Sequence, residues 1–256
     1  MEAKSHTNIV TEQFGSRARA YLESAVHAEG EDLRAVAALL QGAKDARVLD
    51  LGCGAGHVSY VAARYAASVV AYDVAPQMLA VVEEEAKRRG LANITTRHGA
   101  AEALPFADAG FDFVLSRYSA HHWQNFRAGL QEAARVLKPS GRAIFMDTIA
   151  PASPLLDTFL QAMELLRDVS HVRDYTQAEW EAAANAAALT VITTKLGRLR
   201  LGFASWISRM NTPPVRAEAI RSLQQAAPSL VQEHFAIEPD GSFTLDTLLL
   251  ELARSG

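Results

Sequence analysis

Between residues 47 and 147 the chain alternates between short apolar runs and longer stretches in which apolar residues recur every three or four positions. The short runs predict buried strands, and the longer stretches predict helices that turn one face to a core. Helices are expected at 58–65, 76–89 and 126–137, and a turn at 138–141. Strands are expected at 47–51, 69–73, 94–98, 111–116 and 143–147. This alternation indicates an α/β fold with helices on both faces of a mostly parallel sheet.

The pattern continues on both sides of this core. Upstream, it predicts helices at 11–27 and 32–40. Downstream of a proline-containing linker, it predicts helices at 155–167 and 177–188, a β-rich stretch at 190–201, two or three helices within 203–235 and a last strand at 242–250. We interpret residues 1–256 as a single domain with three regions, namely N-terminal helices (1–45), a core (46–150) and a substrate-side insertion with the last strands (151–256).

Composition narrows the class of protein. The chain has 256 residues, a formal net charge of −4 and an isoelectric point near 6.1. This charge does not favour a nucleic-acid partner, which requires clustered Lys and Arg. The single cysteine rules out an internal disulfide and suits a reducing cytoplasm. Because we find neither an apolar run of spanning length nor a signal-peptide core, we expect a cytoplasmic protein. We expect it to be either a monomer or a homodimer.

A glycine-rich turn follows the first predicted strand, with Gly52, Gly54 and Gly56 at alternate positions. Glycine permits positive φ and a close approach of a ligand to the main chain. The helix that begins behind the turn favours an anionic group. A dinucleotide fingerprint would need glycine at His57, which disfavours an NAD-dependent dehydrogenase, and a P-loop is excluded because no Gly-Lys-Ser/Thr follows. Asp50, inside the strand, would repel a pyrophosphate but attract an ammonium group.

The second strand ends in Asp73, about where nucleotide-binding folds place the acid that accepts hydrogen bonds from ribose. A carboxylate holds a free diol and repels a 2′-phosphate. The turn fits a ligand with an ammonium and a carboxylate, and Asp73 fits a ribose. Together these features indicate S-adenosylmethionine.

Five segments support this cofactor, and they are VLDLGCGAGH, VVAYD, GAAEALPF, FDFVLSRYSAHHW and EAARVLKPSGRAIFMD. In order and spacing they resemble the motifs of class I S-adenosylmethionine-dependent methyltransferases, and in particular the type 11 group with the ubiquinone and menaquinone C-methyltransferases. The motifs span residues 47–147. The resemblance implies a Rossmann-like, doubly wound, seven-stranded and mostly parallel sheet whose last strand is antiparallel and inserted between its two predecessors. It also implies N-terminal helices over the cofactor and a helical lid over the substrate.

Residue by residue, the turn chemistry and the resemblance together give a candidate cofactor site. Its members are Tyr21, Asp50, Gly52, Cys53, Gly54, Gly56, Asp73, Val74, Met78, Ala100, Ala101, Glu102, Ser116 and Arg117. Cys53 is interpreted as a small residue in a tight turn, because the sequence shows no positive partner that would activate a thiol. Ala100 departs from the Asp or Ser usual in the family, so only main-chain contacts to adenine are expected near Ala101 and Glu102.

Two histidines are the candidate catalytic residues. A neutral imidazole of His121 or His122 could accept a proton from the methyl acceptor near pH 7, although a purely structural role is the alternative. The sequence offers no further ligand at a suitable spacing, so no metal is expected. Arg167, Asp168, His171 and Arg173 form a polar cluster that we expect to bind the substrate.

The predicted function is methyl transfer from S-adenosylmethionine to a carbon or oxygen nucleophile by in-line displacement. Apolar residues at 199–207 beside the polar cluster predict a moderately hydrophobic small molecule that carries a carboxylate or enolate. Arg167 or Arg173 would hold the anion. The sequence does not identify the acceptor or distinguish carbon, oxygen and nitrogen methylation. Two alternatives stay open: a module that binds S-adenosylmethionine without catalysis and, less favoured, the dehydrogenase.

Overall fold

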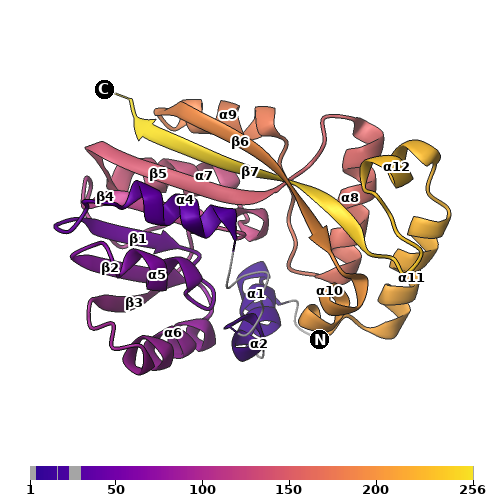
Figure 1. The fold of residues 1–256 in the computed structure, drawn as a ribbon, viewed down its shortest axis with the longest axis horizontal. Helices are drawn as coiled ribbons and strands as arrows, with labels where there is room; N and C mark the ends of the chain where they lie inside the picture. Colours follow the sequence, from indigo (N-terminus) through magenta and orange to yellow (C-terminus); the bar gives the residue numbers. More distant parts are fainter. Residues whose placement is uncertain (1–3, 16, 23–29, 256) are drawn as a thin grey trace.

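The computed structural model describes residues 4–15, 17–22 and 30–255. Within these residues the chain forms a seven-stranded sheet in the order β3-β2-β1-β4-β5-β7-β6 (Figure 1). Neighbouring strands are parallel except β7, which is antiparallel to both β5 and β6. The strands are β1 (Arg47–Leu51), β2 (Ser68–Asp73), β3 (Ile94–His98), β4 (Phe111–Arg117), β5 (Leu137–Ile149), β6 (Leu189–Leu201) and β7 (Phe243–Arg254). The predicted sheet and the predicted place of its last strand are confirmed.

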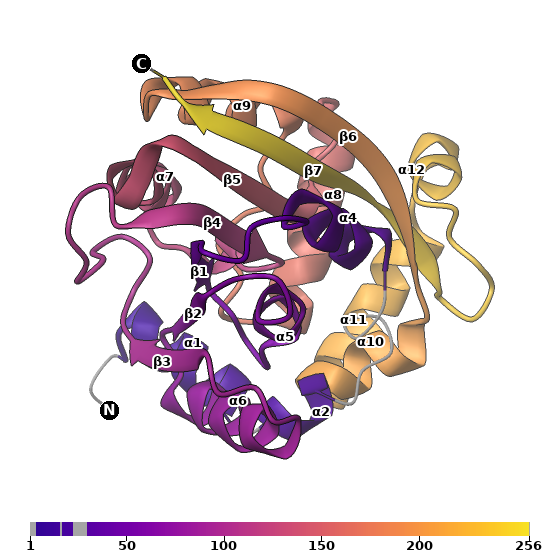
Figure 2. The same ribbon diagram turned by 60° about the vertical axis from the view of Figure 1, so that its left-hand side comes forward.

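Helices cover both faces of this sheet (Figure 2). The chain starts with α1 (His6–Gly15), α2 (Ala18–Leu22) and α4 (Glu31–Leu39). Within the core come α5 (His57–Ala62), α6 (Pro76–Arg88), the 3-10 turn η1 (Ala120–His122) and α7 (Phe126–Val136). The remaining helices are α8 (Pro154–Arg167), α9 (Gln177–Ala186), α10 (Phe203–Met210), α11 (Pro214–Gln225) and α12 (Ser229–His234).

Strand β1 shows how the sequence produces the layers. Its side chains alternate between the two faces. Val48 packs with α4 and α5, whereas Leu49 packs with α7 and α9, and both side chains are fully buried. Burial contributes about 1.5–3 kcal/mol for each such side chain. Buried apolar side chains on both faces therefore fix β1 in the middle of the sheet, where its carboxyl end faces the candidate site.

A separate layer of helices, α8 and α10–α12, lies at one end of the sheet, at the right of Figure 1. The long strands β6 and β7 reach into this layer and contribute Leu201 and Phe243 to its core, which also contains Trp206 and Phe235. Prolines at the first turns of α8 and α11 suit the helix starts. We call these four helices the lid; the helical lid expected from the sequence comprised only the helices between the last two strands, which correspond to α10–α12.

The first helix differs from its prediction. In place of one helix over 11–27, α1 begins earlier and ends at Gly15, and α2 follows. Gly15 ends α1 next to the end of the Gln77 side chain of α6. Residues 23–27 of the predicted helix lie outside the described part.

Residues 138–141 also differ from their prediction, because they belong to β5 and do not form a separate turn. In the pairing of β5 with β4, Leu137 pairs with Phe111 and the next pair joins Arg142 to Phe113. Four residues of β5 therefore stand opposite one residue of β4. The Lys-Pro-Ser-Gly segment therefore bulges out of the ladder. A proline, which lacks an N–H donor, is tolerated at such a place.

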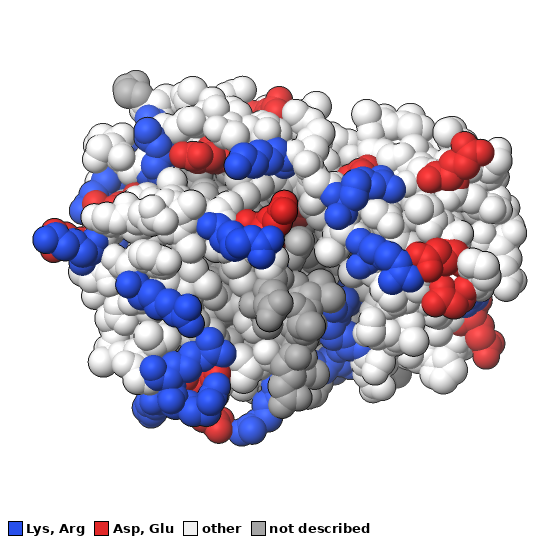
Figure 3. All heavy atoms as spheres, in the orientation of Figure 1, with Lys and Arg blue, Asp and Glu red and all other residues white. Residues whose placement is uncertain are grey.

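Charges on the face drawn in Figure 3 are mixed in sign, with basic side chains gathered at the lower left, where α6 lies in Figure 1. On α6, Glu85 pairs with both Arg88 and Arg89. Among the described residues, none of the helices combines the length and the apolar character that a membrane span requires.

Candidate active site

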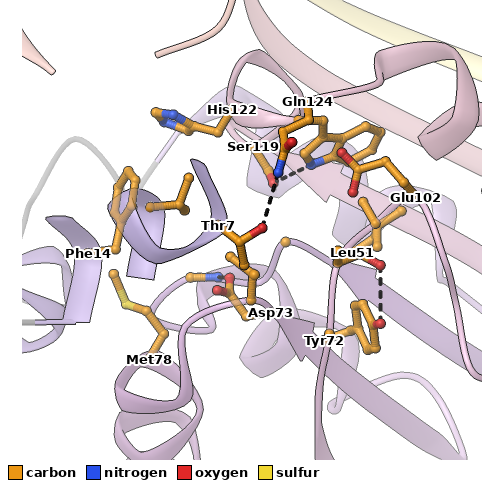
Figure 4. A pocket seen from close by; sticks show the side chains of 18 of the residues that line it. Thr7, Phe14, Leu51, Tyr72, Asp73, Met78, Glu102, Ser119, His122 and Gln124 are labelled. Carbon is orange, nitrogen blue, oxygen red and sulfur yellow. Dashed lines mark hydrogen bonds between the residues drawn. The ribbon is translucent and has the colours of Figure 1, made fainter. Parts of the chain in front are cut away.

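A cavity of about 690 Å³ lies at the carboxyl ends of β1, β2 and β4, between the sheet and α1 (Figure 4). Open α/β sheets bind ligands at this place, beyond the carboxyl ends of their strands. We call it the first cavity. Eight predicted cofactor residues line it, namely Gly52, Gly54, Asp73, Val74, Met78, Ala100, Ala101 and Glu102.

The glycine turn forms one wall of the first cavity. Gly52, Gly54 and Gly56 all have positive φ, of 70°, 50° and 87°. A Cβ at Gly52 would collide with Ser119, and one at Gly56 would collide with Tyr60. At Gly54 a Cβ would meet no atom of the described chain within 4 Å. The main chain at Gly54 therefore borders open space, which leaves room for a ligand to lie against it.

Asp73 is held in place by the turn that it faces. Its Oδ2 accepts a hydrogen bond from the Gly54 N–H at 2.8 Å, and its Oδ1 accepts one from the Ala75 N–H at 2.8 Å. Burial raises the pKa of Asp73, and these backbone donors oppose the rise. Each carboxylate oxygen has a second lone pair. Asp73 can therefore accept further hydrogen bonds from a ligand without moving.

Helix α1 closes the first cavity from the other side. His6, Thr7, Val10 and Phe14 line the cavity at intervals that place them on one helix face. Thr7 Oγ1 accepts a hydrogen bond from Gln124 Nε2 at 3.1 Å, which Figure 4 shows across the opening. Sequence reasoning does not identify Thr7 or Gln124 as cavity residues.

Next to α6 and the segment after β3, the first cavity is bordered by apolar and main-chain groups. The Met78 side chain is buried and borders the cavity. The carbonyl of Ala100 accepts a hydrogen bond from the Tyr72 hydroxyl at 3.2 Å. Glu102 Oε1 accepts one from the Asn125 N–H at 3.2 Å. These contacts fix the segment after β3, so its main chain forms a firm edge of the cavity.

Other predicted cofactor residues support the cavity from outside its lining. Asp50 is buried and accepts a 2.6 Å hydrogen bond from Ser59 on Oδ2, while its Oδ1 has no partner within the described chain. Burial raises the pKa of Asp50 to about 7, although the Ser59 bond opposes this. Cys53 is buried, and its pKa is also raised by burial, which makes a reactive thiolate unfavourable.

Gly56, Ser116 and Arg117 likewise lie outside the cavity lining in the part of the chain that the structure describes. Gly56 is the N-cap of α5, and Ser116 is buried within β4. The Arg117 guanidinium pairs with Asp32 of the α4 helix at 2.5 Å, so it joins α4 to the sheet. The Tyr21 side chain lies outside the described structure.

A second cavity, of about 570 Å³, lies between the first cavity and the lid. Phe14, Tyr118 and His122 line both cavities, so we call these three residues the junction. Tyr118 adopts an unusual positive φ of 52° directly after β4. Such a conformation is costly for a residue with a side chain and concentrates at functional sites. Sequence reasoning did not identify Tyr118, although its place after a strand end was a signal.

His121 lines the second cavity and forms a dyad with Asp147 at the end of β5. Its Nδ1–H donates to Asp147 Oδ1 at 2.6 Å; the Asp147 side chain is buried and the His121 side chain is partly buried. Burial opposes a charge on the ring, but the charge of Asp147 and this hydrogen bond raise the pKa of His121 to about 9. At neutral pH His121 is therefore an imidazolium, which can donate a hydrogen bond but cannot accept a proton.

His122 has the opposite character. Its Nδ1 lies 3.1 Å from the carbonyl oxygen of Ser170, so Nδ1 carries the hydrogen and Nε2 carries the lone pair. Burial, and then the charge of His121, lowers the pKa of His122 well below its ordinary value. The two rings lie 4.2 Å apart. The pair therefore carries one positive charge, on His121, and the neutral imidazole of His122 lies at the junction.

The predicted substrate residues separate into two groups. Arg167, at the end of α8, lines the second cavity together with Glu164 and Arg209, which sequence reasoning missed. In the described structure Asp168, His171 and Arg173 are not part of that lining.

The residues outside the second cavity have structural partners. Asp168 Oδ1 accepts hydrogen bonds from the Ser170 N–H at 2.8 Å and from its hydroxyl at 2.7 Å. This turn aims the Ser170 carbonyl at His122. Arg173 pairs with Asp157 at 2.9 Å and with Glu179 at 3.5 Å. Arg167, not Arg173, is therefore the predicted arginine that lines the second cavity.

Comparison with known proteins connects this site with a family. Residues 49–145 match the family described as a methyltransferase domain, of type 11. The Escherichia coli protein YafE is 48% identical over 204 residues, which cover 80% of this chain and 99% of YafE. The Bacillus subtilis protein YcgJ, named an uncharacterized methyltransferase, is 35% identical over 243 residues, which cover 93% of this chain and 96% of YcgJ.

Solved structures agree with these relatives. The crystal structure of YcgJ superposes with a TM-score of 0.83 at 33% identity and covers 88% of this chain and 99% of its own. A Bacillus halodurans structure, described as that of a putative methyltransferase, gives a TM-score of 0.85 at 27% identity and covers 89% of this chain and 100% of its own. The relatives that match over nearly their whole length, the fold and the glycine turn all lead to one assignment. The chain belongs to the type 11 family of class I S-adenosylmethionine-dependent methyltransferases.

Proposed function

We propose that S-adenosylmethionine binds in the first cavity, that a small-molecule acceptor binds in the second, and that the methyl group passes between them at the junction of Phe14, Tyr118 and His122. The observation that carries this proposal is that the two cavities share these three lining residues. Two ligands that react must meet, and the junction is where the two cavities adjoin.

The residues of the first cavity suit the parts of this cofactor. Asp73 retains lone pairs for the two ribose hydroxyls, and Gly54 lets a ligand approach the main chain. Met78 supplies an apolar surface for the adenine ring. The unpartnered Oδ1 of Asp50 lies next to the turn, where an ammonium group or a bridging water would satisfy it.

When bound, the cofactor supplies an electrophilic methyl group on a sulfonium, and its transfer leaves the neutral thioether of S-adenosylhomocysteine. The protein's contribution is mainly to place the acceptor in line with that methyl group. Positioning of this kind can supply about 7–11 kcal/mol of the barrier at best. Phe14 and Tyr118, which border both cavities, would exclude water from the path and orient the acceptor.

The proton of the acceptor has a defined destination in this arrangement. His122 Nε2 carries a lone pair at the junction, because Nδ1 donates to Ser170. We assign His122 as the group that accepts a proton from a carbon or oxygen nucleophile. His121, charged through Asp147, would stabilise negative charge on the acceptor, so the two adjacent histidines have different roles.

Calorimetric titration with S-adenosylhomocysteine and NAD tests the cofactor assignment. We expect binding of S-adenosylhomocysteine and none of NAD. Binding of NAD alone, or of neither ligand at millimolar concentration, would overturn the assignment. Methyl-labelled cofactor incubated with cell extract then tests catalysis. Tight cofactor binding without any labelled product from extracts and a broad metabolite panel would favour a binding module over an enzyme.

A further inference from the structure

We infer that the methyl acceptor is a small organic acid, whose ionised oxygen is held between the guanidinium of Arg167 and the Asp147-backed ring of His121. The inference rests on the proposed function, because it assigns the acceptor to the second cavity. It adds the chemical class of that acceptor, with a negative charge at one end and an apolar remainder.

The first observation is the balance of charge on the cavity wall. The basic side chains in the described lining are Arg167, Arg209, His121 and His122, of which His122 is neutral, and Glu164 is its carboxyl. Burial raises the pKa of Glu164, while the nearby Arg167 opposes this. The described wall therefore carries a net positive charge whether Glu164 is ionised or not. The carboxylate of Asp147 that balances His121 lies behind the ring and outside the cavity lining.

The second observation is that Arg167 is held in position. Its Nε–H donates to the carbonyl of Trp206 at 3.2 Å, and its guanidinium carbon lies 4.9 Å from the centre of the Trp206 ring. Its Nη1 lies 3.5 Å from Glu164, which is at the limit of a hydrogen bond. A guanidinium has five N–H donors, so these contacts leave donors available for a ligand. A fixed, partly satisfied guanidinium is well suited to bind a carboxylate.

The third observation is the apolar remainder of the wall. Leu199, Leu201 and Leu245 come from the extended parts of β6 and β7 and line the same cavity as the charged groups. Trp206 contributes a buried aromatic surface from α10. A neutral polar acceptor would match neither part of this wall. An acid with an aryl or alkyl body matches both.

The test uses protein loaded with S-adenosylhomocysteine and matched probe pairs, namely benzoate, phenylacetate and octanoate with their amides. Each amide keeps the shape of its acid but lacks the charge. Calorimetry should show at least one acid binding about tenfold or more tightly than its amide, the difference expected for one charged hydrogen-bonded contact. Equal affinity of acid and amide in every pair, or no binding of any acid at millimolar concentration, would overturn the inference.

Variants distinguish loss of the Arg167 contact from general damage to the lid. Arg167→Met should weaken acid binding by about 10- to 100-fold and leave amide binding unchanged. Arg167→Lys keeps the positive charge but loses the planar guanidinium, so its affinity for the acid should lie between those of wild type and Arg167→Met. Arg200→Met is the control, because Arg200 pairs with Glu238 on the surface and lies outside both cavities of the described structure. Equal losses in Arg167→Met and Arg200→Met would contradict the inference.

The cofactor readout distinguishes two kinds of failure. Arg167 lies outside the first cavity, so binding of S-adenosylhomocysteine should be the same in all three variants. If wild-type protein does not bind S-adenosylhomocysteine, the proposed function fails. If it binds S-adenosylhomocysteine but prefers no acid to its amide, the acceptor class alone is wrong.

Discussion

Replacement of Asp73 by alanine is the most informative change in the first cavity. The carboxylate accepts hydrogen bonds from Gly54 and Ala75 and has one lone pair left on each oxygen for the ribose. A hydrogen bond to a charged group contributes about 1.5–3 kcal/mol, and part of each is recovered by water in the variant. We therefore expect Asp73→Ala to weaken binding by about 2–4 kcal/mol, or about 30- to 700-fold.

The assay is calorimetric titration with S-adenosylhomocysteine, with thermal unfolding to confirm that the variant folds. Asp73→Asn is the conservative companion, since it keeps one acceptor oxygen for the turn and should lose less affinity. Cys53→Ala is the control, because Cys53 is buried, lies within the same turn and is absent from the described lining of the cavity. The reasoning is refuted if Asp73→Ala binds as tightly as wild type, or if Cys53→Ala loses more affinity than Asp73→Ala.

Three further changes test other parts of the site. Gly54→Leu should abolish cofactor binding by filling the first cavity, whereas Gly42→Leu, with a similar positive φ and open surroundings, should leave affinity unchanged; equal affinities would contradict this wall. The double change His121→Ala/His122→Ala should lower turnover far more than cofactor affinity in labelled-methyl assays, and unchanged turnover would remove both from catalysis. By NMR, the His121 ring of the wild-type protein should lose its proton near pH 9. The contribution of the charged His121 ring to folding stability is therefore complete below pH about 6.5 and is lost as pH rises through about 9. In Asp147→Asn that titration should move well below pH 9, and an unchanged titration would show that the dyad is not its cause.

The cofactor side of the site could be predicted because its parts are local in sequence. The glycine turn and Asp73 each follow a strand with a readable apolar pattern, and parallel pairing brings the two strand ends together. Thr7 and Gln124 were missed because they meet across 117 residues, and nothing in either segment reports this contact.

The acceptor side shows where sequence reasoning ends. His121 and His122 are adjacent and chemically identical, yet one faces Asp147, which is 26 residues away, and the other faces a carbonyl 48 residues away. These distant partners give the two rings opposite protonation. Arg167 and Arg173 are similarly alike in sequence, and only the end of α8 and the pairing of Arg173 with Asp157 separate their roles.

The central claim is that the two cavities hold two ligands that meet at the junction. A crystal structure with S-adenosylhomocysteine bound tests it most directly. The account predicts the ribose hydroxyls on the Asp73 carboxylate, and the sulfur directed toward Phe14, Tyr118 and His122 with the second cavity open beyond it. A sulfur directed away from these three residues, or a ligand outside the first cavity, would contradict the account.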